Sequence, residues 1–327
     1  MELRMPLQFT VLASGSRGNA CYLNAGGFGL LLDAGLGPRM LLSRLAVVGV
    51  TWSKIHAVLL THTHADHWKD RTLAQLLRQR IPIFCHPAHH AALLSEGEYF
   101  AKMQAAGLVQ TYEDDLPCIF ADGFQCRPVP LPHDCAATFG FRFQGTLQGQ
   151  EWSLGYAADL GSWTEALAGV LADVDLLALE FNHDVDMEVT SGRPGDLIQR
   201  VLGDFGHLSN AQAAGLLRTV LQRSQPGRLQ QLVQLHLSRE CNLPEIAARA
   251  AQSVLADYPF RIAVHTALQD RPSPTFPVRT SSGAERDPAK PTCSPAMLRK
   301  DDRRSVPANS PVNAKTACQT FLPGWET

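Results

Sequence analysis

The stretch LLTHTHADHWKD, residues 59–70, is the most specific pattern in this chain. Its apolar run ends at Thr61, and the next six residues supply four side chains that can bind a metal: His62, His64, Asp66 and His67. Imidazole and carboxylate ligands together suit Zn, Mn or Fe and make a poor calcium site. A polar loop that merely carries surface histidines would not need this density of ligands. We therefore predict a metal centre at the end of a strand.

These four side chains cannot all complete one tetrahedral shell, because they come from one short loop. We expect His62 and His64 to face one metal ion, and Asp66 and His67 to face a second. Both ions then need ligands from elsewhere in the chain. Three candidates each follow an apolar run: His133 after PVPLP, Asp159 after SLGYAA and His236 after LVQL. A rim of strand ends is a natural place for a binding site.

Short apolar runs alternate with helical patterns up to about residue 270. We expect strands at 9–14, 29–35, 56–62, 82–86, 153–159, 175–181 and 232–237, and helices near 38–48, 70–79, 194–202, 210–222 and 243–257. The first half is rich in β patterns. This order favours an α/β fold with sheets sandwiched between helices over a strictly alternating parallel sheet. We expect one domain, residues 1–270.

The last part of the chain differs in composition. Residues 271–327 hold nine of the 21 prolines and no apolar period, so we predict a disordered Pro/Arg-rich tail. Because this tail carries a charge of about +4 and the whole chain −2, residues 1–270 carry about −6. A slightly acidic body exerts no global attraction on nucleic acid. A polyanionic substrate would need a local positive site.

The cysteine pattern and the first residues bear on the cellular compartment. The eight cysteines are scattered with no C-x-x-C motif, which is typical of reduced thiols in a cytoplasmic protein. The opening residues show no secretory signal pattern. No apolar run is long enough to predict a membrane span.

Several motifs resemble those of one family. THTHADH (61–67), followed by separate His, Asp and His residues, is similar to the metallo-β-lactamase superfamily. LASGSRGN (12–19), LLLDAG (30–35), LEFNHD (179–184), GHLSN (206–210) and LHLSRECN (235–242) resemble its YycJ-type branch, related to ribonuclease Z-like phosphodiesterases and associated with exonuclease activity on DNA. The likeness runs from about residue 7 to 264. It implies a four-layer αββα sandwich with two divalent metal ions, Zn or Mn.

The resemblance also implies roles for the ligand residues. It assigns His62, His64 and His133 to the first metal ion. It assigns Asp66, His67 and His236 to the second, with Asp159 as a bridge. Asp33, at the end of GLLLD, resembles a carboxylate that orients the histidine loop, although it could equally be a turn residue before Gly35. Arg17 and Cys241 stand where small residues or Asn are commoner, which leaves the substrate contacts open.

Such a two-metal site supports hydrolysis. Two divalent ions about 3.5 to 4 Å apart can hold a bridging hydroxide and lower its pKa towards neutrality, which makes a nucleophile at pH 7. The same cations neutralise charge that develops on a phosphoryl or acyl oxygen. Redox di-iron relatives replace the second loop histidine with glutamate, so His64 speaks against oxygen or nitric oxide chemistry.

The tripeptide His-Leu-Ser occurs twice, and its flanks predict two roles. His236 ends an apolar strand, and a helix is expected after it with Asn242 as N-cap and Glu245 three residues later. His207 precedes Ser209-x-x-Gln212, a capping box that opens a helix with a buried Leu and Val stripe. A helix N-terminus favours neutral imidazole and attracts phosphate.

We therefore interpret His236 as a metal ligand and His207 as a general acid or phosphate contact. Ribonuclease Z-like relatives carry a histidine at the corresponding place that protonates the leaving oxygen, and this supports the interpretation. The alternative for His207 is a residue that only caps its own loop. The catalytic residues that we predict are Asp66, His207, Glu180 and His183, with Asp184 as a further supporting group. Three arginines could grip phosphates or could simply be surface residues: Arg193, Arg200 and Arg239.

The sequence thus favours a dinuclear-metal hydrolase, most plainly a phosphodiesterase or exonuclease that acts on DNA or on another phosphodiester. Only 76 residues separate Asp159 from His236, so the large capping domain of RNA-processing relatives is absent. A thioesterase of the glyoxalase II type, or another small-molecule hydrolase, is the alternative enzyme. A binding module with a vestigial site is disfavoured, because all seven ligand positions are filled. The metal, the choice among DNA, RNA and a small diester, and the oligomeric state stay open.

Overall fold

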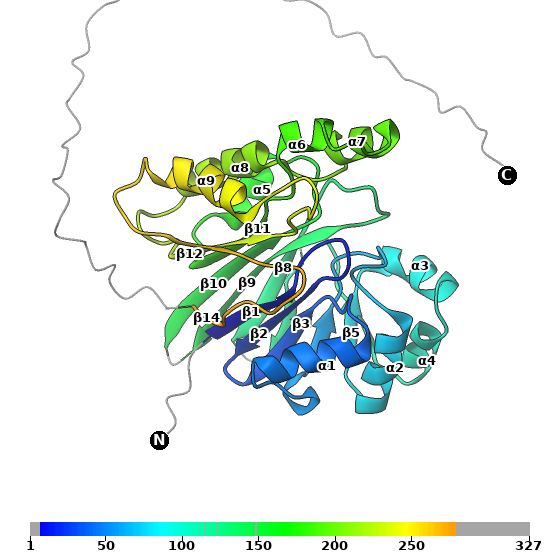
Figure 1. Cartoon of the computed structure of the whole chain (residues 1–327). Coiled ribbons are helices and arrows are strands. Elements are labelled where there is room, and N and C mark those ends of the chain that lie inside the picture. The colour runs from blue at the N-terminus through cyan, green and yellow to red at the C-terminus, as the bar shows by residue number, and fades with distance from the viewer. Residues whose placement is uncertain (1–6, 115, 122, 148, 279–327) are drawn as a thin grey trace, which may run out of the picture. The chain divides into compact units, whose positions relative to one another are not determined.

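The computed structural model of the chain describes residues 7–114, 116–121, 123–147 and 149–278. In this part, two seven-stranded sheets lie face to face, and helices cover the outer face of each (Figure 1). The predicted α/β class and the four-layer αββα arrangement are confirmed. Within the described ranges, no helix is both long enough and apolar enough to cross a membrane.

The first sheet has the strand order β14-β1-β2-β3-β4-β5-β6. Strands β1 to β3 form an antiparallel meander, whereas β3 to β6 are parallel. The strands are β1 Leu7–Ala13, β2 Ala20–Ala25, β3 Phe28–Leu32, β4 Ala57–Leu59, β5 Ile83–Cys85, β6 Val109–Thr111 and β14 Phe276–Pro277. The helices of this half are α1 Pro38–Val47, α2 Asp70–Gln79, α3 His90–Ser95 and α4 Tyr99–Ala105, with short 3-10 turns at Trp52–Lys54 and Pro87–His89.

The second sheet repeats this plan, with the order β13-β12-β11-β10-β9-β8-β7. Here β7 to β10 are antiparallel and β10 to β13 are parallel. The strands are β7 Cys118–Ala121, β8 Phe124–Pro130, β9 Phe139–Leu147, β10 Gln150–Ala157, β11 Leu176–Glu180, β12 Gln231–Leu235 and β13 Ala263–Thr266. The helices are α5 Glu165–Leu171, α6 Val185–Val189, α7 Gly195–Leu202, α8 Asn210–Arg223 and α9 Pro244–Leu255.

Three apolar layers hold the sandwich together. The inner faces of the two sheets share one core, whose largest side chains include Phe9, Phe141, Phe143 and Trp152. Each sheet packs its other face against its own helices. Full burial of a Leu or Phe side chain stabilises a fold by about 1.5–3 kcal/mol. These layers therefore fix the two sheets, and the loops at their edges, relative to each other.

The parallel halves of the sheets place several loops together. In the first sheet, β3 and β4 end side by side, and the backbone of Asp33 donates a hydrogen bond to Leu59 at 2.9 Å. In the second sheet, β10, β11 and β12 are adjacent and parallel, so their following residues lie at one edge. The amide of Phe139 donates to the carbonyl of Thr61 at 3.2 Å and links the two edges.

The predicted strands and helices are present, mostly one to three residues shorter than expected. The short helices α3 to α6 have no counterpart in the prediction, because five to seven residues hold too few turns for a periodic signal. The described chain also continues past the predicted boundary at residue 270. Phe276 and Val278 are buried, and Phe276 pairs with Phe9 of β1. The rest of the predicted tail lies outside the described residues.

Candidate metal centre

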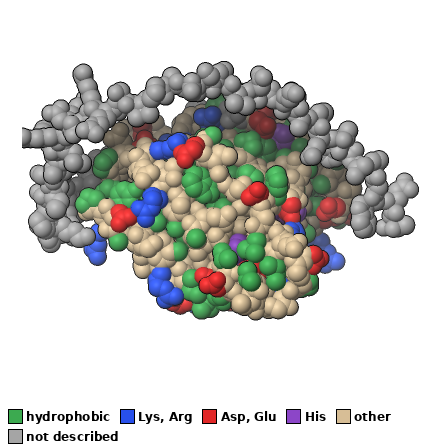
Figure 2. Space-filling view, turned by 90° about the horizontal axis from the view of Figure 1, so that it is seen from above, with side chains coloured by type: hydrophobic (Ala, Val, Ile, Leu, Met, Phe, Trp, Pro, Cys, Tyr) green, Lys and Arg blue, Asp and Glu red, His purple; other side chains and the backbone are tan. Residues whose placement is uncertain are grey.

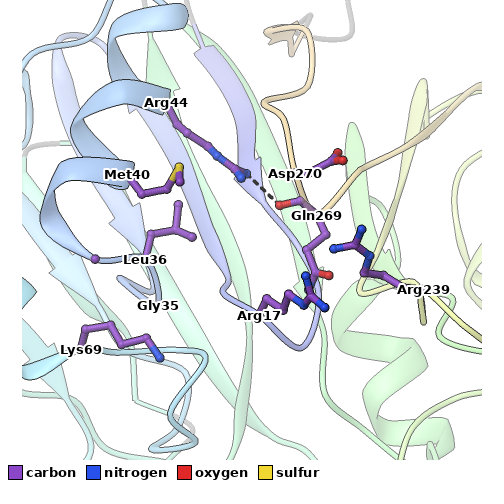
Figure 3. Close-up of a pocket in the computed structure, with 10 residues that line it drawn as sticks. Arg17, Gly35, Leu36, Met40, Arg44, Lys69, Arg239, Gln269 and Asp270 are labelled. Carbon is purple, nitrogen blue, oxygen red and sulfur yellow. Dashed lines mark hydrogen bonds between the residues drawn. The ribbon is translucent and has the colours of Figure 1, made fainter.

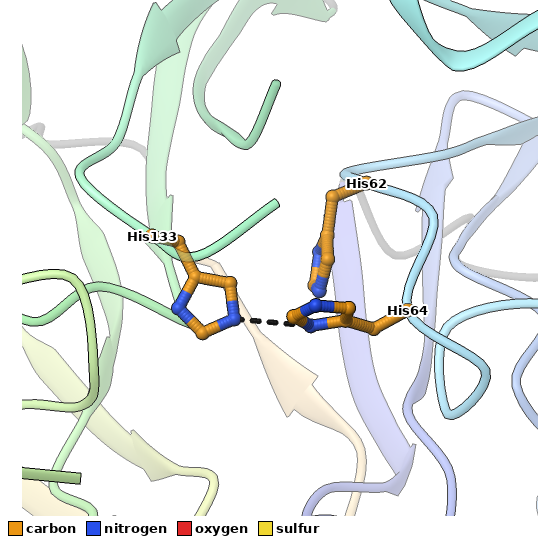
Figure 4. Close-up of side chains that lie close together, drawn as sticks. All are labelled: His62, His64 and His133. Atoms are coloured by element: carbon orange, nitrogen blue, oxygen red, sulfur yellow. Dashed lines mark hydrogen bonds between the residues drawn. The ribbon is translucent and has the colours of Figure 1, made fainter. Parts of the chain in front are cut away.

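The first group of ligand candidates comes from the histidine loop and the loop after β8. His62, His64 and His133 converge, as Figure 4 shows, with ring centroids 4.8 to 5.2 Å apart. Nε2 of His133 lies 3.2 Å from Nδ1 of His64. Nδ1 of His133 lies 3.0 Å from the carbonyl oxygen of Gly206, which can only accept. Nδ1 therefore carries the proton, and Nε2 presents its lone pair to the cluster.

The histidine loop is anchored by a buried carboxylate. Asp33 accepts hydrogen bonds from the backbone N–H of Thr61 at 2.8 Å and from its hydroxyl at 3.0 Å. The same side chain lies 2.7 Å from Nδ1 of His67. Burial raises the pKa of Asp33, and His67 opposes that rise. Asp33 thus contacts the loop as the orienting carboxylate would, rather than only shaping a turn.

The second group joins both sheets. Asp66, His67 and His236 place one ligand atom each within 4.8 Å of one another. Oδ2 of Asp66 is 3.7 Å from Nε2 of His67 and 3.7 Å from Nε2 of His236. His236 follows β12 directly with a φ of 54°, and its backbone N–H donates to Ser14 at 2.8 Å. The end of β12 therefore turns the His236 ring towards the histidine loop.

Asp159 lies between the two groups. Its Oδ2 is 3.1 Å from Nε2 of His67, and its Oδ1 is 3.3 Å from Nε2 of His236. It also forms a ligand-like group with His62 and His67. Burial would raise the pKa of Asp159, but His236 and His67 outweigh it and hold that pKa well below its usual range. Its place matches that of a bridging ligand.

Unpaired buried atoms test whether a cation fits this cluster. His62 Nε2 is buried and lacks a hydrogen-bond partner in the described chain, and the buried Asp159 Oδ2 and His236 Nε2 have ion-pair contacts but no hydrogen bond. An unpaired buried polar atom costs about 1–3 kcal/mol unless another partner, such as an ion, satisfies it. These nitrogen and carboxylate atoms are also the ligand types that Zn and Mn accept. The donor set therefore fits divalent metal ions.

The protonation states point the same way. Burial lowers the pKa of His236, but Asp159 and Asp66 outweigh it and raise that pKa to about 9. Burial also lowers the pKa of His67, but Asp33 and Asp159 outweigh burial and raise that pKa. The carboxylates of the cluster therefore favour positive charge beside them. A divalent cation can replace these protons when it binds.

His207 lies at the rim of the cluster and contacts a buried glutamate. Its Nδ1 is 3.0 Å from Oε1 of Glu180, and its ring stacks on His236 with centroids 5.0 Å apart. Glu180 is fully buried and also accepts from the backbone N–H groups of Leu208, at 3.0 Å, and Asp159. The His207 side chain is 19% exposed. With Nδ1 on the carboxylate, Nε2 is the nitrogen left to face a substrate.

Two residues of LEFNHD do not join the cluster. The His183 ring is buried, and neither of its nitrogens has a partner among the described residues. It belongs to none of the ligand groups found there. Asp184 caps α6 by accepting from the backbone N–H of Met187 at 3.1 Å. The structure therefore brings only Glu180 of this motif to His207.

Three residues that contact the site were missed by sequence reasoning. Asn19 donates to Asp66 at 3.1 Å and lies 2.9 Å from Nε2 of His67. Asn182 contacts Nδ1 of His236 at 3.1 Å. Asp134 places Oδ1 3.4 Å from Nε2 of His133. Asn19 ends the motif LASGSRGN, Asn182 lies in LEFNHD, and Asp134 directly follows His133. The sequence could have indicated these contacts only through the position of each residue in a site motif or next to a ligand candidate.

The prediction that Asn242 caps the following helix is wrong. Helix α9 begins at Pro244, so its N-cap position falls on Leu243. Asn242 instead exchanges hydrogen bonds with Asn210 at 2.9 and 3.0 Å and donates to the carbonyl of Phe181 at 2.9 Å. The proline at the first helical position moves the start of the helix and releases the asparagine for these contacts. By contrast, the capping box of Ser209 and Gln212 is present.

The three candidate phosphate-binding arginines differ in their contacts. Arg193 pairs with Glu188 and Glu240, each at 3.0 Å. Arg200 pairs with Asp134. Arg239 is exposed and makes no such contact among the described residues. Of these three arginines, only Arg239 therefore has a guanidinium group that no carboxylate contacts among the described residues.

Comparisons with known proteins extend this description. A family model described as a beta-lactamase superfamily domain matches residues 29–226. Exodeoxyribonuclease WalJ of Streptococcus pneumoniae is 28% identical over 265 residues, which cover 80% of this chain and 93% of that protein. Exodeoxyribonuclease YycJ of Bacillus anthracis is 26% identical over 283 residues, which cover 84% of this chain and 98% of that protein.

A solved structure gives the same result for the fold. The metallo-beta-lactamase fold protein YhfI of Bacillus subtilis matches with a TM-score of 0.58 at 18% sequence identity, over 82% of this chain and 99% of that one. The resemblance drawn from the sequence motifs is confirmed by these matches.

Proposed function

The chain belongs to the beta-lactamase superfamily, and from this premise we propose that it is a metal-dependent phosphodiesterase that acts as an exonuclease on DNA. One observation carries the proposal. A cluster of seven ligand candidates lies beside a partly exposed histidine whose inner nitrogen contacts a buried glutamate. The names of the two relatives, both exodeoxyribonucleases, support DNA as the substrate.

Two sets of residues would hold the metal ions. We propose that one ion is held by His62, His64 and His133, and that the other is held by Asp66, His67 and His236. We propose Asp159 as the residue shared by both. When bound, such ions would supply Lewis acidity towards the phosphoryl oxygens and a water of lowered pKa.

The residues of the chain position the remaining chemistry. His207 would hold a proton on Nε2 and donate it to the oxygen that leaves the phosphate. Glu180 would act as a positioning residue, because it is fully buried and contacts His207 rather than the substrate space. Asp66, whose side chain is 22% exposed, would be the carboxylate nearest to the substrate. His183 would support the loop rather than take part in the reaction, since its ring lies outside the ligand groups.

A reducing compartment is consistent with this assignment. All six cysteines in the described ranges are free, and five of them are buried. Burial raises the pKa of the Cys21 and Cys85 thiols, which keeps them unreactive. We propose that the protein works in the cytoplasm, where such thiols stay reduced and where DNA is accessible.

A substrate panel tests the proposal. Protein loaded with Zn or Mn would be incubated with 5′- and 3′-labelled single- and double-stranded DNA, RNA, bis(p-nitrophenyl) phosphate and a glutathione thioester. We expect stepwise shortening of DNA from one end and slower turnover of the small diester. A variant with His62→Ala is the control for a contaminating nuclease. Turnover of the thioester alone would overturn the proposal in favour of a thioesterase.

A further inference from the structure

A cavity is lined by residues that stand close in sequence to the ligand candidates. We call it the cationic pocket; its volume is about 330 Å³ (Figure 3). Its lining residues are Arg17, Gly35, Leu36, Gly37, Met40, Arg44, Lys69, Arg239, Gln269 and Asp270. Four of these residues are basic and one is acidic, in a domain whose body is acidic as a whole. This is the local positive site that a polyanionic substrate needs.

Three basic residues of the cationic pocket lie in loops that also carry residues of the candidate metal centre. Lys69 stands two residues after His67, and Arg239 stands three residues after His236. Arg17 lies in the loop whose Asn19 contacts Asp66. A side chain at Gly35 would approach within 1.6 Å of the Asp66 carbonyl oxygen, so the glycine lets these two loops touch. The pocket and the candidate metal cluster are therefore built in part on the same loops.

Three cations of the pocket are available for a ligand. Among the described residues, neither Arg17 nor Arg239 makes a hydrogen bond or an ion pair, and both are exposed. Lys69 gives one hydrogen bond to the carbonyl of Ala65 at 2.5 Å, which leaves two of its N–H groups. Figure 3 shows Arg17 and Arg239 near Gln269, with Lys69 across the pocket.

The fourth cation is already used by the fold. Arg44 donates to the carbonyl oxygens of Leu12 at 2.7 Å and Gln269 at 2.8 Å. Burial lowers the pKa of Arg44, and the nearby Asp270 carboxylate partly offsets this effect. Arg44 and Asp270 therefore balance each other, and the net positive charge comes from the other three cations.

A polar side chain in the pocket also lacks a partner. Both the amide oxygen and the amide nitrogen of Gln269 are buried, and neither has a hydrogen-bond partner in the described chain. Gln269 rests against Gly15, where a Cβ atom would come within 2.6 Å of its amide nitrogen. A buried amide is normally satisfied by protein, water or ligand. Here the group lies beside the free arginines and could hydrogen-bond to the same ligand.

The opposite wall is apolar. Met40 is 51% exposed on α1, and Leu36 lies beside it at the pocket wall. A methionine side chain adapts to flat apolar surfaces, because it is flexible and polarisable. A ligand with one anionic part and one apolar part would therefore fit, and a nucleotide unit has this character.

On the basis of the proposed function, we propose that the cationic pocket binds a phosphate of the DNA strand other than the one being cleaved. The anion would lie between Arg17, Lys69 and Arg239, and the adjoining sugar or base would lie against Met40. Because the pocket shares its loops with the metal centre, a phosphate held there would fix how far the strand extends past the reacting phosphate. Charged contacts of this kind add affinity and register without reading the base sequence.

Paired substitutions test the inference by a readout that does not depend on turnover. Arg17→Gln and Arg239→Gln would be combined in the full-length, metal-loaded protein. Binding of a labelled phosphorothioate single strand, which resists cleavage, would be followed by fluorescence anisotropy at several salt concentrations. We expect affinity to fall about tenfold to a hundredfold, because charge-assisted hydrogen bonds are lost. The slope of log affinity against log salt should also shrink by about 0.7 for the lost phosphate.

A matched control and a second measurement make the result decisive. Arg249→Ala removes another exposed arginine, on α9, that does not line the pocket. This control should leave the affinity for the labelled strand unchanged. If it weakened binding as much as the double variant does, the loss of affinity would reflect the overall charge of the protein, and the proposal would be overturned. For cleavage, the double variant should raise KM for DNA much more than KM for bis(p-nitrophenyl) phosphate, since that diester has no second phosphate.

The two proposals fail in different ways. If the wild-type protein cleaves no phosphodiester, the proposed function is overturned, whatever the pocket binds. If it shortens DNA but the double variant binds the phosphorothioate strand as tightly as the wild type, only the pocket is rejected. No binding of that strand by the wild type would also reject the pocket. Gln269→Ala should weaken binding severalfold, which separates the unpaired amide from the arginines.

Discussion

The two His-Leu-Ser segments carry the same tripeptide but lie in different local structures. His236 follows the strand β12, has a φ of 54° and is buried against Asp66 and Asp159. His207 precedes helix α8 and directs Nδ1 at Glu180. The strand end presents a ring to the interior of the ligand cluster, whereas the helix start leaves the ring at its rim. Local structure, rather than the tripeptide, thus separates the proposed metal ligand from the proposed proton carrier.

The two segments are nevertheless tied to each other. Asn210 directly follows the first segment and Asn242 stands four residues after the second, and the two asparagines exchange two hydrogen bonds. LEFNHD lies between them: the Asp184 amide donates to Cys241 at 2.8 Å, and the carbonyl of His183 accepts from Asn210 at 2.7 Å. The stacked rings of His207 and His236 are therefore held by one network of side-chain and backbone hydrogen bonds. Any difference between the roles of His207 and His236 therefore comes from the contacts of their ring nitrogens.

The largest expected effect is that of His236→Ala. This change removes one ligand and one of the groups that enclose the cluster, so we expect loss of about one metal ion per chain and a fall in activity of about a thousandfold or more. Metal content by plasma mass spectrometry, with turnover of bis(p-nitrophenyl) phosphate, checks both. Full metal content in this variant would break the division between the two histidines.

Replacing the second histidine should have a different signature. His207→Ala should keep both metal ions and lower kcat about a hundredfold to ten-thousandfold, because a general acid is lost. A substrate with a good leaving group needs little protonation, so bis(p-nitrophenyl) phosphate should suffer less than DNA. Equal metal loss in the two alanine variants would refute the distinction.

Glu180→Gln should act through His207. The amide keeps the shape of the buried side chain but removes the charge beside Nδ1, so we expect a fall in kcat of about tenfold to a hundredfold with metal retained. Glu188 supplies the control, because it is also fully buried but pairs with Arg193 instead. Glu188→Gln should lower the melting temperature without a comparable loss of kcat. A merely structural role for Glu180 would make the two variants alike.

The smallest effect concerns the serines of the two segments. Ser209 caps α8 by accepting from Gln212 at 3.2 Å, whereas Ser238 accepts from the Cys241 amide in a turn. Ser209→Ala should therefore reduce the free energy of unfolding by about 1 kcal/mol, and Ser238→Ala by less. Urea unfolding of both variants measures the difference. A larger loss for Ser238 would show that the turn, not the capped helix, holds the network.

The sequence anticipated the fold and the ligand cluster because both depend on local patterns. Apolar runs locate strands, and ligand residues directly after them, such as His62 and His236, must lie at strand ends. The capping box of Ser209 was also visible, since its partner stands three residues away. Side chains that can serve either a local cap or a long-range contact were harder to assign from the sequence. Asn242 suits a cap by its type, but its contacts with Asn210 depend on how two distant loops meet.

The same limit explains the remaining differences. His183 has the chemistry of a catalytic residue and stands beside others that have it, yet its ring lies outside the ligand groups. Asn19 ends a glycine-rich loop and gave no sign of its contact with Asp66, which is 47 positions away. The cationic pocket combines loops from the two ends of the domain. The surface seen in Figure 2 mixes acidic and basic side chains, so net charge could not reveal the pocket.

Backbone conformation sets a limit on how this protein can be engineered. Within the described chain, the non-glycine residues with left-handed φ are Asp33, Arg80, Asp159, Asp173 and His236. Each such residue stores about 1 kcal/mol or more. Three of them belong to the candidate metal centre, so glycine there would relax the backbone but remove a proposed ligand or the carboxylate that contacts the histidine loop. Asp173 accepts a hydrogen bond from Gln225 at 2.6 Å, whereas Arg80 only closes α2. A thermostable variant would therefore begin with glycine at Arg80, where relaxation spares both the hydrogen bond of Asp173 and the candidate metal centre.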